Sequence, residues 1–136
     1  MYPEYLVAPM RQELTNAGFE DLRTADDVNT AIKADGTVFV MVNSVCGCAA
    51  ANARPAAKIA SQQDKRPDKF VTVFAGMEKE AVDQARSLML PYPPSSPSMA
   101  LFKDGKLVHI IERHQIEGRP AQMIADNLIQ AFEQYC

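Results

Sequence analysis

Two cysteines separated by one glycine, Cys46-Gly47-Cys48, are the residues of this chain best suited to chemistry. They follow an apolar, β-branched run at residues 37–42, and an alanine-rich segment at residues 49–62 follows them. This order predicts that the pair lies where a buried strand turns into a helix. Unpaired N–H groups at a helix start carry partial positive charge, which stabilises a thiolate and lowers the cysteine pKa below its free value of about 8.5. Because the thiolate is the attacking species in disulfide exchange, the position predicts a nucleophile near neutral pH.

The single residue between the cysteines bears on both access and redox behaviour. We expect Gly47 to let the backbone bend tightly and to leave the sulfurs open to a bulky disulfide, as part of a substrate-binding surface. A disulfide between Cys46 and Cys48 closes a very small ring, which predicts strain and a better oxidant than a relaxed C-x-x-C pair. Such a bond also forms less readily, so a one-cysteine mechanism stays open beside a two-cysteine one.

Other interpretations of the pair remain open. Free cysteine is among the most buried residue types, so the two can be small core residues of a non-catalytic interaction module. They can also belong to a copper(I) or zinc carrier. A zinc site usually has four ligands at close spacing, whereas His109 and His114 are distant in sequence and are expected in a strand and a loop. Two cysteines around a glycine, directly after a buried strand, favour redox chemistry.

Apolar periodicity predicts the elements that must position the pair. An N-terminal helix has Leu6, Met10 and Leu14 on one face, with Pro9 inside it and Gly18 as its stop. A capping box at residues 24–27 begins a second helix, whose apolar face is Val28, Ala31 and Ile32. After the cysteines we expect a helix interrupted by Pro55 and then a strand at 70–75. A helix at 78–89 follows, with Val82, Ala85 and Met89 facing inward. Residues 90–97 form an irregular segment. Asp104-Gly105 then joins two strands, 98–102 and 107–111, into a hairpin. Arg119-Pro120 opens a final helix with the apolar stripe Met123, Ile124, Leu128, Ala131 and Phe132.

The order of these elements predicts an α/β fold with a mixed sheet and helices on both faces, formed by residues 1–136 as a single domain. That is a thioredoxin-like layout. Folds of this type place a cis-proline just before the third core strand, facing the active cysteines. Pro97 occupies that position and is the second candidate for the substrate-binding surface. A trans loop proline is the alternative, and the fold favours cis.

Composition narrows the class of protein. The 136 residues carry a net charge of −3, without the basic stripe that nucleic-acid binding usually needs. No apolar run approaches the roughly 20 residues that span a bilayer, so no membrane partner is expected. The first residues have neither a basic nor an apolar signal region, so we expect a cytoplasmic protein, where structural disulfides are rare. Cys136 is then an incidental thiol, unless the tail folds back so that it resolves a mixed disulfide.

A longer sequence string carries a family resemblance. The segment VNSVCGCAA at residues 42–50, continued by NARPA at 52–56, resembles the bacilliredoxin family. The resemblance extends over the whole chain, including residues 5–19, the region of Pro97 and the C-terminal cysteine. A bare C-x-C would not single out this family, whereas the extended string does.

The resemblance implies a thiol–disulfide oxidoreductase that removes bacillithiol from mixed disulfides on proteins, with disulfide isomerase activity as well. By this resemblance Cys46 is the attacking residue and takes the bacillithiol, and Cys48 or a second bacillithiol resolves the product. The implied partners are S-thiolated client proteins and bacillithiol or a similar low-molecular-weight thiol, with no bound cofactor and no metal. The ligand is anionic, so Arg54 is a candidate carboxylate contact, with a solvated arginine as the favoured alternative. The oligomeric state is left open.

Two positions depart from ordinary thioredoxins. Val45 precedes the first cysteine where thioredoxins have tryptophan, and Val40 stands where they commonly have a buried acid. No proton shuttle is therefore evident, and direct reduction by thioredoxin reductase is not expected.

Overall fold

The central strand of the fold is the apolar run that precedes the cysteines. In the computed structural model, which describes residues 1–136, this strand is β2 (Thr37–Asn43), and all seven of its residues are buried. It pairs in parallel with β3 (Lys69–Phe74) and antiparallel with β4 (Ser98–Lys103). A strand paired on both edges and covered on both faces needs a continuous apolar sequence, which is the pattern seen here.

The complete sheet has the strand order β1-β3-β2-β4-β5. Its parallel edge is β1 (Glu20–Asp21), a two-residue strand that the sequence pattern does not predict. Its antiparallel edge is β5 (Lys106–Ile111), the second half of the predicted hairpin. Asp104 and Gly105 both have positive φ, 51° and 81°, as a tight I′ turn requires. The predicted mixed sheet and hairpin are confirmed.

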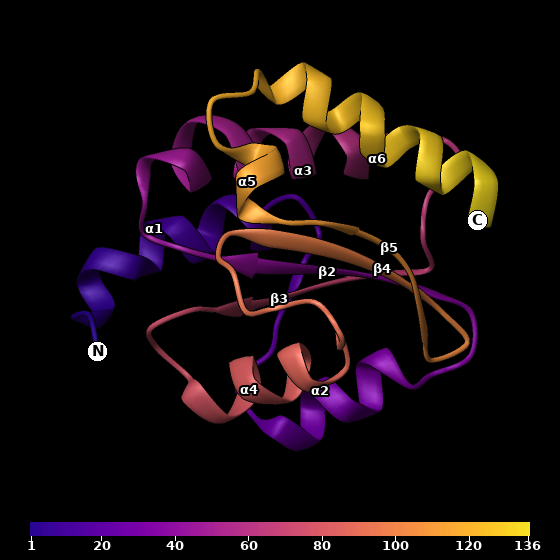
Figure 1. The fold of residues 1–136 in the computed structure, drawn as a ribbon. Coiled ribbons are helices and arrows are strands. Elements are labelled where there is room, and N and C mark those ends of the chain that lie inside the picture. Colours follow the sequence, from indigo (N-terminus) through magenta and orange to yellow (C-terminus); the bar gives the residue numbers. More distant parts are fainter.

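Helices cover both faces of the sheet (Figure 1). One face lies under η1 (Ala49–Ala53), α3 (Arg54–Ser61) and α6 (Ala121–Tyr135), and the other under α2 (Ala25–Ile32) and α4 (Lys79–Ser87). Two further helices are α1 (Glu4–Thr15) and the short α5 (Arg113–Ile116). None of these helices has the length and apolarity needed to cross a membrane.

Alternation along β2 divides the apolar interior into two cores. Phe39 and Met41 point into the core beneath α3 and α6, whereas Val38, Val40 and Val42 point into the core beneath α2 and α4. This follows from the two-residue repeat of a strand, whose side chains alternate between faces. Because both cores hold the same strand, the end of β2 is fixed firmly in space.

The predicted caps and apolar faces are mostly confirmed. The Thr24 side chain accepts a hydrogen bond from the Asp27 N–H at 3.1 Å, and the predicted faces of α2 and α4 are buried. In α6 the predicted apolar stripe is wrong at one position. Met123 is 53% exposed, whereas the other four residues of the stripe are buried.

The predicted apolar face of α1 is also wrong in part. Leu6 is 42% exposed, and the buried residues are Val7, Arg11 and Leu14. Pro9 lies inside the helix without ending it. Arg11 points inward because its guanidinium forms ion pairs with a cluster of acidic side chains there. Apolar periodicity counts arginine as a surface residue, so it selects Leu6 and Met10 where the structure buries Val7 and Arg11, and only Leu14 is common to both.

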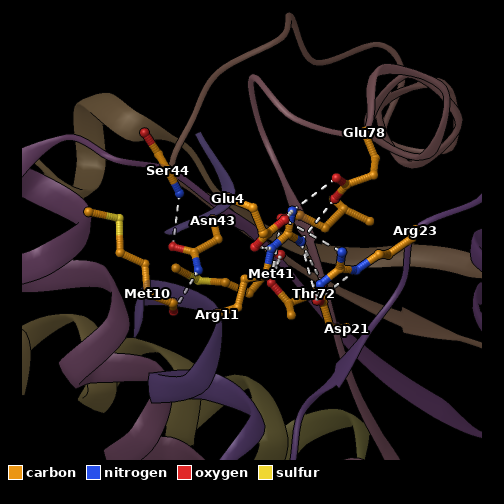
Figure 2. A network of polar contacts seen from close by, with 11 residues as sticks. Glu4, Met10, Arg11, Asp21, Arg23, Met41, Asn43, Ser44, Thr72 and Glu78 are labelled. Atoms are coloured by element: carbon orange, nitrogen blue, oxygen red, sulfur yellow. Dashed lines mark hydrogen bonds and ion pairs between the residues drawn. The ribbon is translucent and has the colours of Figure 1, made fainter. Parts of the chain in front are cut away.

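Arg11 joins α1 to β1 and to the start of α4 (Figure 2). Its guanidinium lies 2.9–3.2 Å from carboxylate oxygens of Glu4, Asp21 and Glu78, and 5.2 Å from the ring centre of Phe74. These acids raise the pKa of Arg11, against the opposing effect of its burial. The guanidinium therefore stays charged and holds three separate segments together.

We expect Arg11→Met to destabilise the protein by about 3–5 kcal/mol, because it leaves the largely buried carboxylate of Glu78 without a cation and leaves Asp21 with only the exposed Arg23. Arg23→Met is the matched control, since Arg23 also pairs with Asp21 but is 51% exposed, and should cost less than about 1 kcal/mol. Urea unfolding of the two variants measures both values. An equal decrease in the free energy of unfolding of the two variants would show that the buried position of Arg11 contributes no extra stability.

Candidate active site

Cys46 and Cys48 form a disulfide at the point where β2 gives way to a helix. Their Cα atoms are 5.4 Å apart. Helical structure begins at Gly47, and the Cys46 carbonyl accepts hydrogen bonds from the N–H groups of Ala49 at 3.1 Å and Ala50 at 3.2 Å. Cys46 is thus the N-cap residue of this helix, which confirms the predicted position at a strand-to-helix junction.

The pair is open to solvent on one side. Cys46 and Cys48 are half-buried, and Gly47 between them is exposed. The alternative of two small core residues is therefore wrong. Of the two reasons expected for Gly47, the tight backbone bend is wrong, because its φ is not positive and a Cβ there would meet no atom within 4 Å. What Gly47 provides is an uncovered surface between the two sulfurs.

The helix that carries the pair is widened in its first turns. In η1 the Arg54 N–H donates to the Ala49 carbonyl five residues back, as in a π-helix. Pro55 follows directly, and the chain remains helical through it instead of being interrupted as predicted. A wider turn relieves the clash between a proline ring and the carbonyl of the preceding turn. Such π-turns occur frequently at functional sites.

Polar side chains at the end of β2 hold the loop before Cys46. The Asn43 Oδ1 accepts from the Ser44 N–H at 2.9 Å and from the Arg54 guanidinium at 3.0 Å, and the Asn43 Nδ2 donates to the Met10 carbonyl at 3.2 Å. Figure 2 shows Asn43 between Ser44 and Met10. The Ser44 Oγ in turn accepts from the Cys46 N–H at 3.3 Å. The position of the first cysteine therefore depends on this chain of hydrogen bonds.

The structure places Arg54 in neither of its two expected environments, which were a contact with the substrate carboxylate and a solvated surface position. It is only 2% exposed, so it is not a solvated arginine. Its guanidinium donates to the Ser44 carbonyl at 2.8 Å and to the Asn43 Oδ1, and pairs with Glu13 at 2.6 Å. Because these internal partners engage the side chain, the geometry gives no support to Arg54 as a carboxylate contact for a substrate. Its contacts are those of a residue that positions the loop before Cys46.

Pro97 lies at the same end of the sheet as the cysteines. The Ser96–Pro97 peptide bond is cis, as the fold predicts, and Pro97 is buried. The next residue, Ser98, pairs with Val42 near the end of β2. Pro97 is thus beside the strand end from which the chain continues to Cys46. Its contact with substrate stays a prediction.

Cys136 lies at the opposite end of the sheet from the pair. Partial burial raises the pKa of its thiol, and a hydrogen bond with the side chain of Thr37 opposes that shift. Thr37 begins β2 and Cys46 follows the end of this strand, so the length of β2 separates the two sites by about 20 Å. The tail does not fold back toward the pair, and Cys136 is not placed to resolve a mixed disulfide on Cys46.

The two histidines lie in separate elements. His109 is in β5 as expected, with Nε2 2.7 Å from the Asn127 Oδ1, whereas His114 lies in α5 and not in a loop. No group of three or more His, Cys, Asp or Glu side chains is arranged to hold a metal ion.

Arg54→Met should lower the free energy of unfolding by about 2–3 kcal/mol, because it leaves the buried Ser44 carbonyl without its donor and removes one of the two donors to the Asn43 Oδ1. The alkylation rate of reduced Cys46 should change with it, since the loop before Cys46 loses its support. Glu13→Gln, which keeps an oxygen for the guanidinium at a 40% exposed position, is the control and should cost less than about 1 kcal/mol. Unchanged stability and alkylation in Arg54→Met would contradict this role.

Gly47→Ala should leave the free energy of unfolding equal to that of the wild type or up to about 1 kcal/mol higher, because alanine fits this helical position. Exchange with protein disulfides should become slower, since the added methyl covers the surface between the sulfurs. Exchange with a small disulfide reagent should change little. Equal rates with a protein disulfide in both proteins would remove Gly47 from the substrate-binding surface.

Comparison with known proteins places this geometry in a family. The family model described as disulphide isomerase matches residues 2–136. A bacilliredoxin of Cytophaga hutchinsonii is 54% identical over 98% of this chain and 99% of its own length. A bacilliredoxin of Staphylococcus haemolyticus is 52% identical over 100% of this chain and 94% of its own length.

Solved structures agree at the level of the fold. A putative oxidoreductase with a thioredoxin fold has a TM-score of 0.64 and 18% identity, and covers 82% of this chain and 94% of its own. Fasciola hepatica thioredoxin has a TM-score of 0.61 and 18% identity, and covers 87% of this chain and 100% of its own. With its cysteine pair at the start of a helix in a thioredoxin-like fold, this chain belongs to the bacilliredoxin family and is a thiol–disulfide oxidoreductase.

Proposed function

We propose that the protein removes bacillithiol, or a similar low-molecular-weight thiol, from mixed disulfides on client proteins. The observation that carries the proposal is the half-exposed Cys46 at the N-cap of a helix, bonded to Cys48. The N–H groups of the first turn favour a thiolate at that place, and the thiolate is the form that attacks disulfides. The relatives named bacilliredoxin, at 50% identity or more, support bacillithiol as the thiol that is transferred.

The first step begins from the reduced pair. The Cys46 thiolate attacks the bacillithiol sulfur of the mixed disulfide, a bond forms between these two sulfurs, and the bond between bacillithiol and the client breaks. The client cysteine leaves as a thiolate and takes a proton from water. No net oxidation or reduction occurs in this exchange, because one disulfide replaces another.

The second step frees bacillithiol. The Cys48 thiolate attacks the Cys46 sulfur, bacillithiol leaves as a thiolate, and the Cys46–Cys48 disulfide forms, which is the bond that the structure contains. Two molecules of a low-molecular-weight thiol then reduce this disulfide and are themselves joined into a disulfide. In the one-cysteine route, a second bacillithiol thiolate attacks the sulfur of the bound one, so that bacillithiol disulfide leaves and Cys46 is regenerated.

Two further properties belong to the same proposal. Attack of Cys46 on a disulfide within a client, followed by return of the client thiolate to a different sulfur, gives disulfide isomerisation, in accord with the matched family description. The reaction requires reduced thiols as co-substrates, and such thiols are maintained in the cytoplasm, so we place the protein there.

The roles of the two cysteines can be separated by substitution. Cys46→Ser should abolish bacillithiol release from a bacillithiolated protein, because the attacking sulfur is lost. Cys48→Ser should retain the first step and accumulate a Cys46–bacillithiol adduct, seen by mass spectrometry of the intact protein. Cys136→Ser is the control and should behave as the wild type, since Cys136 lies at the other end of β2. Release by Cys46→Ser at the wild-type rate would end the proposal.

A further inference from the structure

A small pocket lies between the end of β5 and the helices α5 and α6. It has a volume of about 50 Å³ and is lined by six residues, which are Ile111, Gln115, Arg119, Met123, Ile124 and Asn127. This volume holds a few water-sized groups, which is the size of a carboxylate and far smaller than a whole bacillithiol molecule. The exposed Met123 and the two isoleucines supply apolar walls.

The polar groups that line this pocket are hydrogen-bond donors. The Gln115 Oε1 already accepts from the Glu112 N–H at 3.0 Å, which leaves the Gln115 amide NH₂ as its free group. The Asn127 Oδ1 likewise faces the His109 Nε2 at 2.7 Å, which leaves the Asn127 NH₂. Arg119 adds a guanidinium, which has no ion-pair partner, and no acidic residue lines the pocket. Such a donor-only site suits a carboxylate.

The pocket adjoins the cysteine pair through its own elements. The Asn52 side chain donates to the Arg119 carbonyl, and Asn52 lies one helical turn beyond Cys48. On the other side, the Arg113 guanidinium donates to the Ser96 carbonyl at 3.2 Å, directly before Pro97. The segment from α5 to Arg119 therefore touches both the helix that carries the cysteines and the loop that carries Pro97.

From this placement we infer that the Arg119 pocket binds a carboxylate of the low-molecular-weight thiol while its sulfur is joined to Cys46. The inference rests on the proposed function, and it assigns the anion contact to Arg119 in place of Arg54. Arg54 is buried against internal partners, whereas the Arg119 guanidinium is exposed and unpaired beside the same helix.

Kinetics on two substrates test the assignment. One client protein carries bacillithiol and the same client carries uncharged 2-mercaptoethanol, each as a mixed disulfide. Arg119→Ala should raise KM for the bacillithiolated client about tenfold or more, with kcat nearly unchanged, and should leave the uncharged substrate unaffected. Arg66→Ala, which removes one positive charge beyond the other end of α3, should leave both substrates unaffected.

Each outcome bears on one hypothesis. Arg119→Ala that equals the wild type on both substrates, or that slows both equally, overturns the carboxylate pocket and leaves the proposed function standing. A wild-type protein that releases no bacillithiol overturns the proposed function instead.

A binding experiment decides on the pocket without turnover. S-methylated bacillithiol, which cannot exchange, should shift the side-chain NH₂ signals of Gln115 and Asn127 in NMR spectra of the wild type and of Arg66→Ala, but not of Arg119→Ala. Absence of these shifts in the wild type at millimolar ligand would overturn the inference.

Discussion

The position of the first cysteine depends on how β2 ends. Hydrogen bonds to β3 and β4 fix both edges of this strand, and the two apolar cores fix both faces. Asn43, its last residue, then uses its side chain to hold Ser44 and Arg54, and the Ser44 Oγ accepts from Cys46. Side-chain hydrogen bonds therefore hold the two-residue loop 44–45, at the point where the backbone hydrogen bonds of the sheet end. Fixing the nucleophile in this way limits the backbone reorganisation that attack on a disulfide would cost.

The helix α1 braces this junction from outside the sheet. Three contacts come from one turn of α1. The Met10 carbonyl accepts a hydrogen bond from Asn43, and Glu13 forms an ion pair with Arg54. Arg11 forms ion pairs with Asp21 of β1 and with Glu78 at the start of α4. Two buried arginines thus join α1 to the rest of the fold, Arg11 to β1 and the start of α4, and Arg54 to the loop before Cys46. Removal of either cation leaves buried oxygen atoms without donors, which is costly, whereas the exposed ion pairs elsewhere contribute little.

The sequence predicts those features of the site that depend on apolar patterns and on strong local signals. The unbroken run before Cys46 specifies a strand paired on both edges, and Asp104-Gly105 specifies the turn of the hairpin formed by β4 and β5. It does not predict features that come from long-range charge pairing, because Arg11 and Arg54 are counted as surface residues until their acidic partners are known. The π-turn before Pro55 has no apolar signature either, so the proline is interpreted as an interruption.

Selectivity among disulfides must come from the surroundings of the cysteine pair. Sulfur exchange by the Cys46 thiolate is the same reaction for every accessible disulfide, so the thiolate alone does not distinguish a bacillithiolated client from another one. Gly47 leaves the pair uncovered, which widens access to the sulfurs, and glycine has no side chain that could select one disulfide over another. Recognition must therefore use groups that lie within reach of Cys46 but are not engaged in holding it. Arg54 fails this condition because its guanidinium already binds the Ser44 carbonyl and the Asn43 Oδ1. The segment from α5 to α6 contacts Asn52 and Ser96 on either side of the cysteine pair, and the amide NH₂ groups of Gln115 and Asn127 remain free in it, which is why we infer the carboxylate contact there.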